Sequence, residues 1–123
     1  MSLPRQSVEQ LLSKCLHSDA QAFISTVNLG EIWYTSARKT SAFTADRTVD
    51  DIMAIGIKVV AMDWPLTRSA ADFKSRFRMS FADAFAAALT RSLGADAELA
   101  TGDFEFRAVE KEIRVHWLRA PGA

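Results

Sequence analysis

The sequence predicts an α/β fold in which helices cover both faces of a mainly parallel sheet, as a three-layer α/β/α sandwich. Short apolar runs alternate along the chain with segments whose apolar residues recur at the helical period. This alternation favours parallel strands, because right-handed crossovers place each connecting helix against the sheet. The chain has 123 residues, 49% of them apolar, which suits a single domain over residues 1–123 with one core.

The first half of the chain is expected to contain three helices and two strands. Cys15 lies in the apolar stripe of the first helix, where it reads as a small buried hydrophobe. Ser25 or Thr26 can cap the helix that follows the first strand. The expected elements are a helix at about 5–17, a strand at 22–26, a helix to about Arg38, a helix at 48–57 and a strand at 58–62.

The second half is expected to contain two further helices and two strands. Pro65 suits the first turn of a helix, and Gly94 ends the helix after it. The expected elements are a helix from Pro65 to about Arg76, a helix from Ser80 to Gly94, a strand at 97–101, a short segment at 107–112 and a strand at 113–118. Residues 119–123 read as a loose tail, and residues 1–3 fit either a vector-derived or a native start.

Charge and cysteine content narrow the class of protein. Fifteen basic residues balance fifteen acidic ones, so net charge gives no long-range attraction to nucleic acid and any such contact must be local. The sequence contains no apolar run near the ~20 residues that span a bilayer. It contains no signal peptide, and a single cysteine cannot form an internal disulfide. We therefore expect a cytoplasmic protein with no membrane partner.

Three acids are expected to meet at one edge of the sheet. Glu31 lies in the first turns after the first strand, Asp83 in the first turn of its helix, and Asp103 two residues after a strand. Ligand crevices of open α/β sheets lie at this edge, beyond the carboxyl ends of the strands. Two carboxylates about 4 Å apart repel by roughly 4 kcal/mol, so the cluster favours protons or a hard divalent cation such as Mg²⁺ or Mn²⁺. Such a cation can activate a water, which fits phosphodiester cleavage.

Each acid also has a structural interpretation. Ser80 and Asp83 form a capping box, and Asp103 suits a turn or a helix cap. Glu31 is an ordinary helix former that suits a solvated surface. We favour the site because three separate structural explanations would have to coincide at one edge. Asp63 suits the cap of the next helix, and a phosphate-accepting role like that of a receiver domain lacks the required paired acids and lysine.

Basic residues near the expected edge predict local contacts with the phosphates of a nucleic acid, with a solvated helix face as the alternative. They are Arg38, Lys39, Arg47, Lys74, Arg76 and Arg78.

Three segments, in their order and at their separations, resemble the acidic signatures of PIN domains, particularly the VapC-type toxins of bacterial toxin–antitoxin pairs. They are ISTVNLGEIWY at 24–34, MSFADAFAAAL at 79–89 and ELATGDFEF at 98–106. The resemblance covers almost the whole chain. It implies a divalent-metal-dependent endoribonuclease that hydrolyses RNA phosphodiester bonds with Mg²⁺ or Mn²⁺.

The same resemblance assigns residues and partners. It makes Glu31, Asp83 and Asp103 the catalytic, metal-binding acids, and it gives Thr101 and Glu105 supporting positions. It also implies a homodimer and an antitoxin protein that blocks the site.

One departure from the family pattern bears on activity. PIN domains open with a central apolar strand that ends in an aspartate, and this chain instead begins MSLPRQSVEQ. Truncation of the gene start is favoured over loss of the element, because the later signatures are intact, and either would leave catalysis by this chain open. The alternative function is a non-catalytic degenerate PIN domain that binds an antitoxin or its own copy through apolar faces near Trp33 and Trp64.

Overall fold

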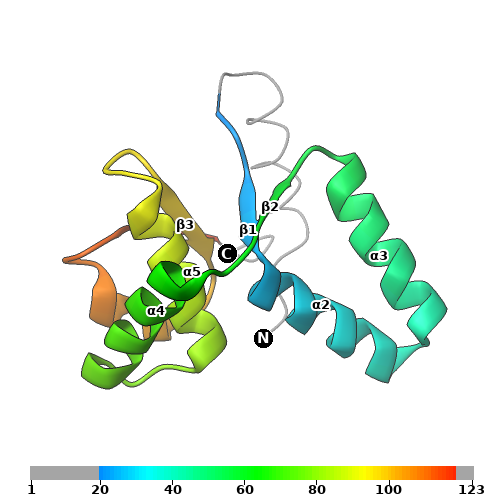
Figure 1. Ribbon diagram of the computed structural model, residues 1–123, viewed down its shortest axis with the longest axis horizontal. Coiled ribbons are helices and arrows are strands. Elements are labelled where there is room, and N and C mark those ends of the chain that lie inside the picture. The colour runs from blue at the N-terminus through cyan, green and yellow to red at the C-terminus, as the bar shows by residue number, and fades with distance from the viewer. Residues whose placement is uncertain (1–19, 119–123) are drawn as a thin grey trace.

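The computed structural model describes residues 20–118 and confirms the predicted alternation of strands and helices (Figure 1). The elements are β1 (Phe23–Ser25), α2 (Thr26–Lys39), α3 (Ala42–Ala54), β2 (Lys58–Val60), α4 (Trp64–Arg76), α5 (Phe81–Ser92), β3 (Glu98–Thr101), the 3-10 helix η1 (Phe104–Val109) and β4 (Arg114–Trp117). The helix predicted at 5–17, with Cys15, and the tail at 119–123 lie outside the described residues.

The strands form two parallel pairs. β1 pairs with β2, with Phe23 opposite Lys58, and β3 pairs with β4, with Thr101 opposite Trp117. Within residues 20–118 the two pairs are not joined into one sheet, so β1 and β3 each have a single strand partner there. Figure 1 shows α2 and α3 on one side of the β1–β2 pair and α4 and α5 on the other. The predicted absence of a central strand stays a prediction.

A side chain caps the start of each of these four helices. The capping oxygen accepts a hydrogen bond from the backbone N–H three residues further on, which satisfies a donor that the helix itself leaves unpaired. The pairs are Ser25 with Asn28, Ser41 with Thr44, Asp63 with Leu66, and Ser80 with Asp83. Of the two predicted caps for α2, the structure selects Ser25, and it gives Asp63 the predicted capping role.

The predicted helix at 48–57 is wrong at both ends. α3 begins at Ala42, because Ser41 supplies a cap, and ends at Ala54. Gly56 follows with a φ of 103°, a left-handed conformation that glycine adopts without strain. Apolar residues recur at the helical period mainly in the second half of α3, so this pattern alone places the start of the helix too late in the sequence.

Helix α5 is the centre of the core. Its residues Ala84, Ala87 and Ala88 are almost completely buried, and their small side chains let α4 pack closely against α5. Phe73 of α4 is completely buried in the same cluster, as is Val109 of η1. The packing therefore fixes the start of α5, where Asp83 lies, relative to η1.

An ion-pair network lies where the C-terminal parts of α4 and α5 meet the turn before β4. The guanidinium of Arg76 donates to both carboxylate oxygens of Glu112, at 2.8 and 2.9 Å, and to Asp72 at 3.0 Å. Arg91 lies 3.6 Å from Glu112. The guanidinium carbons of Arg76 and Arg91 lie 5.4 and 4.5 Å from the ring centroid of Phe73. The network thus joins α4 and α5 to the turn before β4, and the bidentate geometry makes it directional.

Substituting Glu112→Gln should lower the melting temperature at pH 7 by about 1 to 4 °C, since the partners remain partly exposed to solvent. Arg76 holds the pKa of Glu112 below its ordinary value of 4.5. The contribution should therefore be complete above pH 4.5 and disappear as the pH falls through the lowered pKa of the folded protein. Thermal unfolding across pH checks this, with Glu110→Gln as the matched control. Equal melting temperatures for the two variants at pH 7 would contradict it.

Candidate metal centre

Asp83 and Asp103 reach the site from two different elements. Asp83 is the third residue of α5, whose start is fixed by the Ser80 cap. Asp103 follows the end of β3, where the Thr101 hydroxyl accepts a hydrogen bond from the Asp103 backbone N–H at 3.0 Å. The Asp103 carboxylate in turn accepts from the Glu105 backbone N–H at 3.0 Å and caps η1. Thr101 therefore holds the turn that presents Asp103.

Three acids converge at this point. Asp83, Asp103 and Glu105 each offer a carboxylate oxygen, and these oxygens all lie within 4.8 Å of one another. We call these three residues the acidic cluster. Asp83 and Asp103 are half-buried, and Glu105 is exposed. The sequence analysis gave Glu105 a supporting position, whereas the geometry places its carboxylate inside the cluster.

The surroundings of Asp83 raise its pKa. Burial raises the pKa of Asp83 above its ordinary value of 3.8, and the negative charge of Asp103 raises it further. Glu31 and Glu105 add to the rise in pKa, while a hydrogen bond with Ser80 opposes it. Glu31 thus lies near Asp83, although its carboxylate is not one of the three that converge within 4.8 Å. Asp83 and Asp103 thus take part both in helix capping and in the acidic cluster.

The donor set suits a hard divalent cation. The acidic cluster consists only of carboxylate oxygens, the ligands that Mg²⁺ and Mn²⁺ favour, and contains no sulfur or imidazole that would favour zinc. A cation of charge two would also relieve the mutual repulsion that raises the pKa of Asp83. The residues present therefore fit such a metal.

The predicted phosphate-binding residues occupy different surroundings. Arg76 is engaged by Glu112 and Asp72, which leaves little of its charge for a phosphate. The Lys74 ammonium donates to the Met79 carbonyl at 2.9 Å, just before the start of α5.

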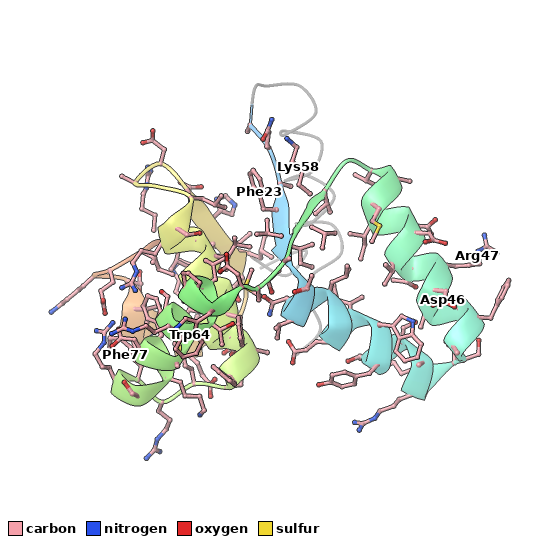
Figure 2. All side chains as sticks on the ribbon, in the orientation of Figure 1. Phe23, Asp46, Arg47, Lys58, Trp64 and Phe77 are labelled. Carbon is pink, nitrogen blue, oxygen red and sulfur yellow. The ribbon has the colours of Figure 1, made fainter. Side chains whose placement is uncertain are left out.

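The remaining predicted basic residues are exposed. Arg38 lies over the ring of Tyr34 at 5.2 Å from its centroid, and Lys39 ends the same helix. Arg78 lies in the loop between α4 and α5. Figure 2 shows Arg47 on the outer side of α3, away from α5. Arg78 is thus the exposed cation nearest in sequence to the start of the Asp83 helix.

Comparisons with known proteins agree with this architecture. A family model for the PIN domain matches residues 4–112. A chain of the VapBC2 complex from Rickettsia felis, crystallised with a DNA fragment from their promoter, superposes with a TM-score of 0.67 at 13% sequence identity, over 93% of this chain and 83% of that one. No curated protein matches significantly. No helix within residues 20–118 is long and apolar enough to cross a membrane. The fold and the family predicted from the three acidic segments are confirmed, and the chain belongs to the PIN-domain family.

Proposed function

We propose that this protein is a divalent-metal-dependent endoribonuclease of the VapC toxin type, which hydrolyses RNA phosphodiester bonds with Mg²⁺ or Mn²⁺. The observation that carries the proposal is the convergence of Asp83, Asp103 and Glu105 within 4.8 Å. Membership of the PIN-domain family supports a nuclease. Glu31, whose charge also raises the pKa of Asp83, would be a fourth acid beside the acidic cluster.

The acids hold the cation and shape the charge around it. When bound, the cation would supply positive charge to the scissile phosphate and lower the pKa of a water. The half-buried Asp83 and Asp103 would be the more firmly held ligands, while Glu105 would contribute a carboxylate that is more open to solvent. Thr101 keeps the Asp103 turn in place through its hydroxyl. Exposed Arg38, Lys39 and Arg78, with Lys74, are the candidates for holding flanking phosphates.

The proposed partners follow the same assignment. An antitoxin protein would control the enzyme, and a homodimer would form in the cytoplasm. A second candidate function is a non-catalytic interaction module. The specific observation that favours it is the exposure of large apolar side chains, with Phe43 71% and Trp64 69% exposed.

Manganese should raise the melting temperature of the wild-type protein. At a concentration about 100 times the dissociation constant, binding adds about 2.7 kcal/mol, which corresponds to roughly 10 °C for a chain of this size. Asp83→Asn should abolish the shift, because it removes a charged ligand from the acidic cluster. Asp96→Asn, an exposed acid in the turn after α5, should retain it. A wild-type protein that does not respond to manganese would favour the interaction module.

Metal binding should depend on pH through Asp83. Because its pKa is raised above 3.8, a proton competes with the cation over a pH range higher than that of an ordinary aspartate. Manganese affinity, measured by calorimetry from pH 7 downward, should therefore fall as the pH approaches and passes the raised pKa.

The metal-free protein should show the linked effect on stability. Protonated Asp83 stabilises the fold fully below pH 3.8, and this contribution is lost as the pH rises through the raised pKa. The stability of wild type relative to Asp83→Asn should fall over that interval. A difference that does not change with pH would contradict the raised pKa.

Cleavage of a single-stranded RNA by the purified protein tests the chemistry directly. We expect cleavage with Mn²⁺ or Mg²⁺, none in the presence of EDTA, and a loss of about 100-fold or more for Asp103→Asn, comparable to removing a major electrostatic contribution to catalysis. Glu105→Gln should also be impaired, because its carboxylate lies in the acidic cluster. Glu110→Gln, which changes the exposed acid just after the end of η1, is the matched control. Wild-type protein that binds manganese but leaves RNA intact would refute the ribonuclease and retain only the metal site.

A further inference from the structure

A side-chain bridge joins the starts of α2 and α5. Asn28, the third residue of α2, donates from Nδ2 to the backbone carbonyl oxygen of Ala82 at 3.0 Å. Its Oδ1 accepts from the hydroxyl of Ser25, and its backbone N–H donates to the same hydroxyl oxygen at 2.9 Å. The amide is therefore held by two partners, one on each side. Ser25 is completely buried, so the anchor of the bridge is fixed in the core.

Both ends of the bridge lie next to residues of the proposed site. Asn28 precedes Glu31 by three residues, which places it about one turn away on the same helix. Ala82 immediately precedes Asp83. The 54 residues that separate Asn28 from Ala82 make this a tertiary contact and not a local cap. Among residues 20–118, no second side-chain hydrogen bond joins α2 to α5. The bridge thus connects the two helix starts that carry Glu31 and Asp83.

Repulsion between the carboxylates of the site tends to push α5 away from its neighbours, and the hydrogen bond from Asn28 to Ala82 opposes this movement. The carboxylate oxygens of Asp83, Asp103 and Glu105 lie within 4.8 Å of one another, so these acids repel one another where α5 and η1 meet. A neutral amide can donate to a carbonyl here without adding charge. An aspartate at the same position would have the same shape but would lack the donor. The amide therefore suits a position that must hold α5 close without making the cluster more negative.

We propose that Asn28 is a positioning residue that sets the separation of Glu31 from Asp83 and so tunes metal affinity, an inference that rests on the proposed metal-dependent function. Its amide is already engaged by Ser25 and Ala82, so it would act without binding the metal itself. Its effect passes through the Ala82 carbonyl to the first turn of α5. Groups that orient ligands in this indirect way typically change metal affinity by about 10- to 100-fold when they are removed.

The test compares manganese affinity, measured by electron paramagnetic resonance, in the purified wild type and three variants below their melting temperatures. Asn28→Ala removes the bridge and should weaken affinity by about 10-fold. Asn28→Ser places a hydroxyl beside Ser25, but its side chain is one bond shorter and does not reach Ala82, so it should lose a similar factor while keeping a polar group at this position. Ser41→Ala is the matched control, since it removes the cap of α3, away from the site. It should lower the melting temperature and leave affinity unchanged.

The outcomes separate this inference from the proposed function. If the wild type binds manganese and both Asn28 variants bind it equally well, Asn28 is only structural and the inference is overturned while the metal site stands. If Ser41→Ala loses as much affinity as Asn28→Ala, the loss reflects general destabilisation, which also overturns it. If the wild type does not bind manganese, the metal function fails and the inference fails with it. Loss of affinity confined to the Asn28 variants supports it.

Discussion

The site can exist only if the fold holds three mutually repelling carboxylates close together. Asp83, Asp103 and Glu105 are held with oxygens within 4.8 Å although each favours separation. At an effective dielectric near 20, one such pair costs about 4 kcal/mol at 4 Å. That cost is comparable to a large fraction of the stability of a small domain. The fold must therefore supply rigid supports for these residues, and a bound cation would relieve part of the cost.

The supports come from packing and not from the acids themselves. Asp83 lies on a helix whose opposite face is almost fully buried, so α5 cannot rotate or withdraw without exposing Ala84 and Ala88. At the other end of the core, the Arg76–Glu112 pair joins α4 to the turn before β4. The residues of η1 contribute Val109 and Phe106 to the same cluster. Asp103 and Glu105 thus belong to a segment that is anchored by its own apolar side chains.

Much of this arrangement could be predicted from the sequence, because it depends on local signals. Ser80 before a run of apolar residues identifies the start of α5, and Asp63 before Trp64 and Pro65 identifies the start of α4. The edge of the sheet follows from the order of the elements. What local signals leave open is which side chains actually converge at that edge.

Glu105 and Arg76 illustrate that limit. Glu105 enters the acidic cluster because η1 is a tight 3-10 turn capped by Asp103, and the sequence predicted only a later segment at 107–112. Arg76 was expected to face phosphates because it lies in a basic run. Its actual partner, Glu112, is 36 residues away and becomes visible only when α4 packs near β4. Pairs such as Arg76 and Glu112 depend on how the elements pack, and the spacing of residues along the sequence does not reveal this.

Net charge and local charge together explain why the cation would matter for substrate as well as for chemistry. The chain is neutral overall, so RNA gains no general attraction to it. Without a metal, the three carboxylates of the acidic cluster would repel a phosphodiester. Under the proposed function, a divalent cation in the acidic cluster would offset most of the charge of its three carboxylates and offer a positive centre to a phosphate, and exposed Arg38 and Arg78 would add favourable contacts. In this scheme the metal that would assist hydrolysis would also reduce the repulsion that the phosphate meets, so substrate binding and catalysis would both depend on the same occupied site.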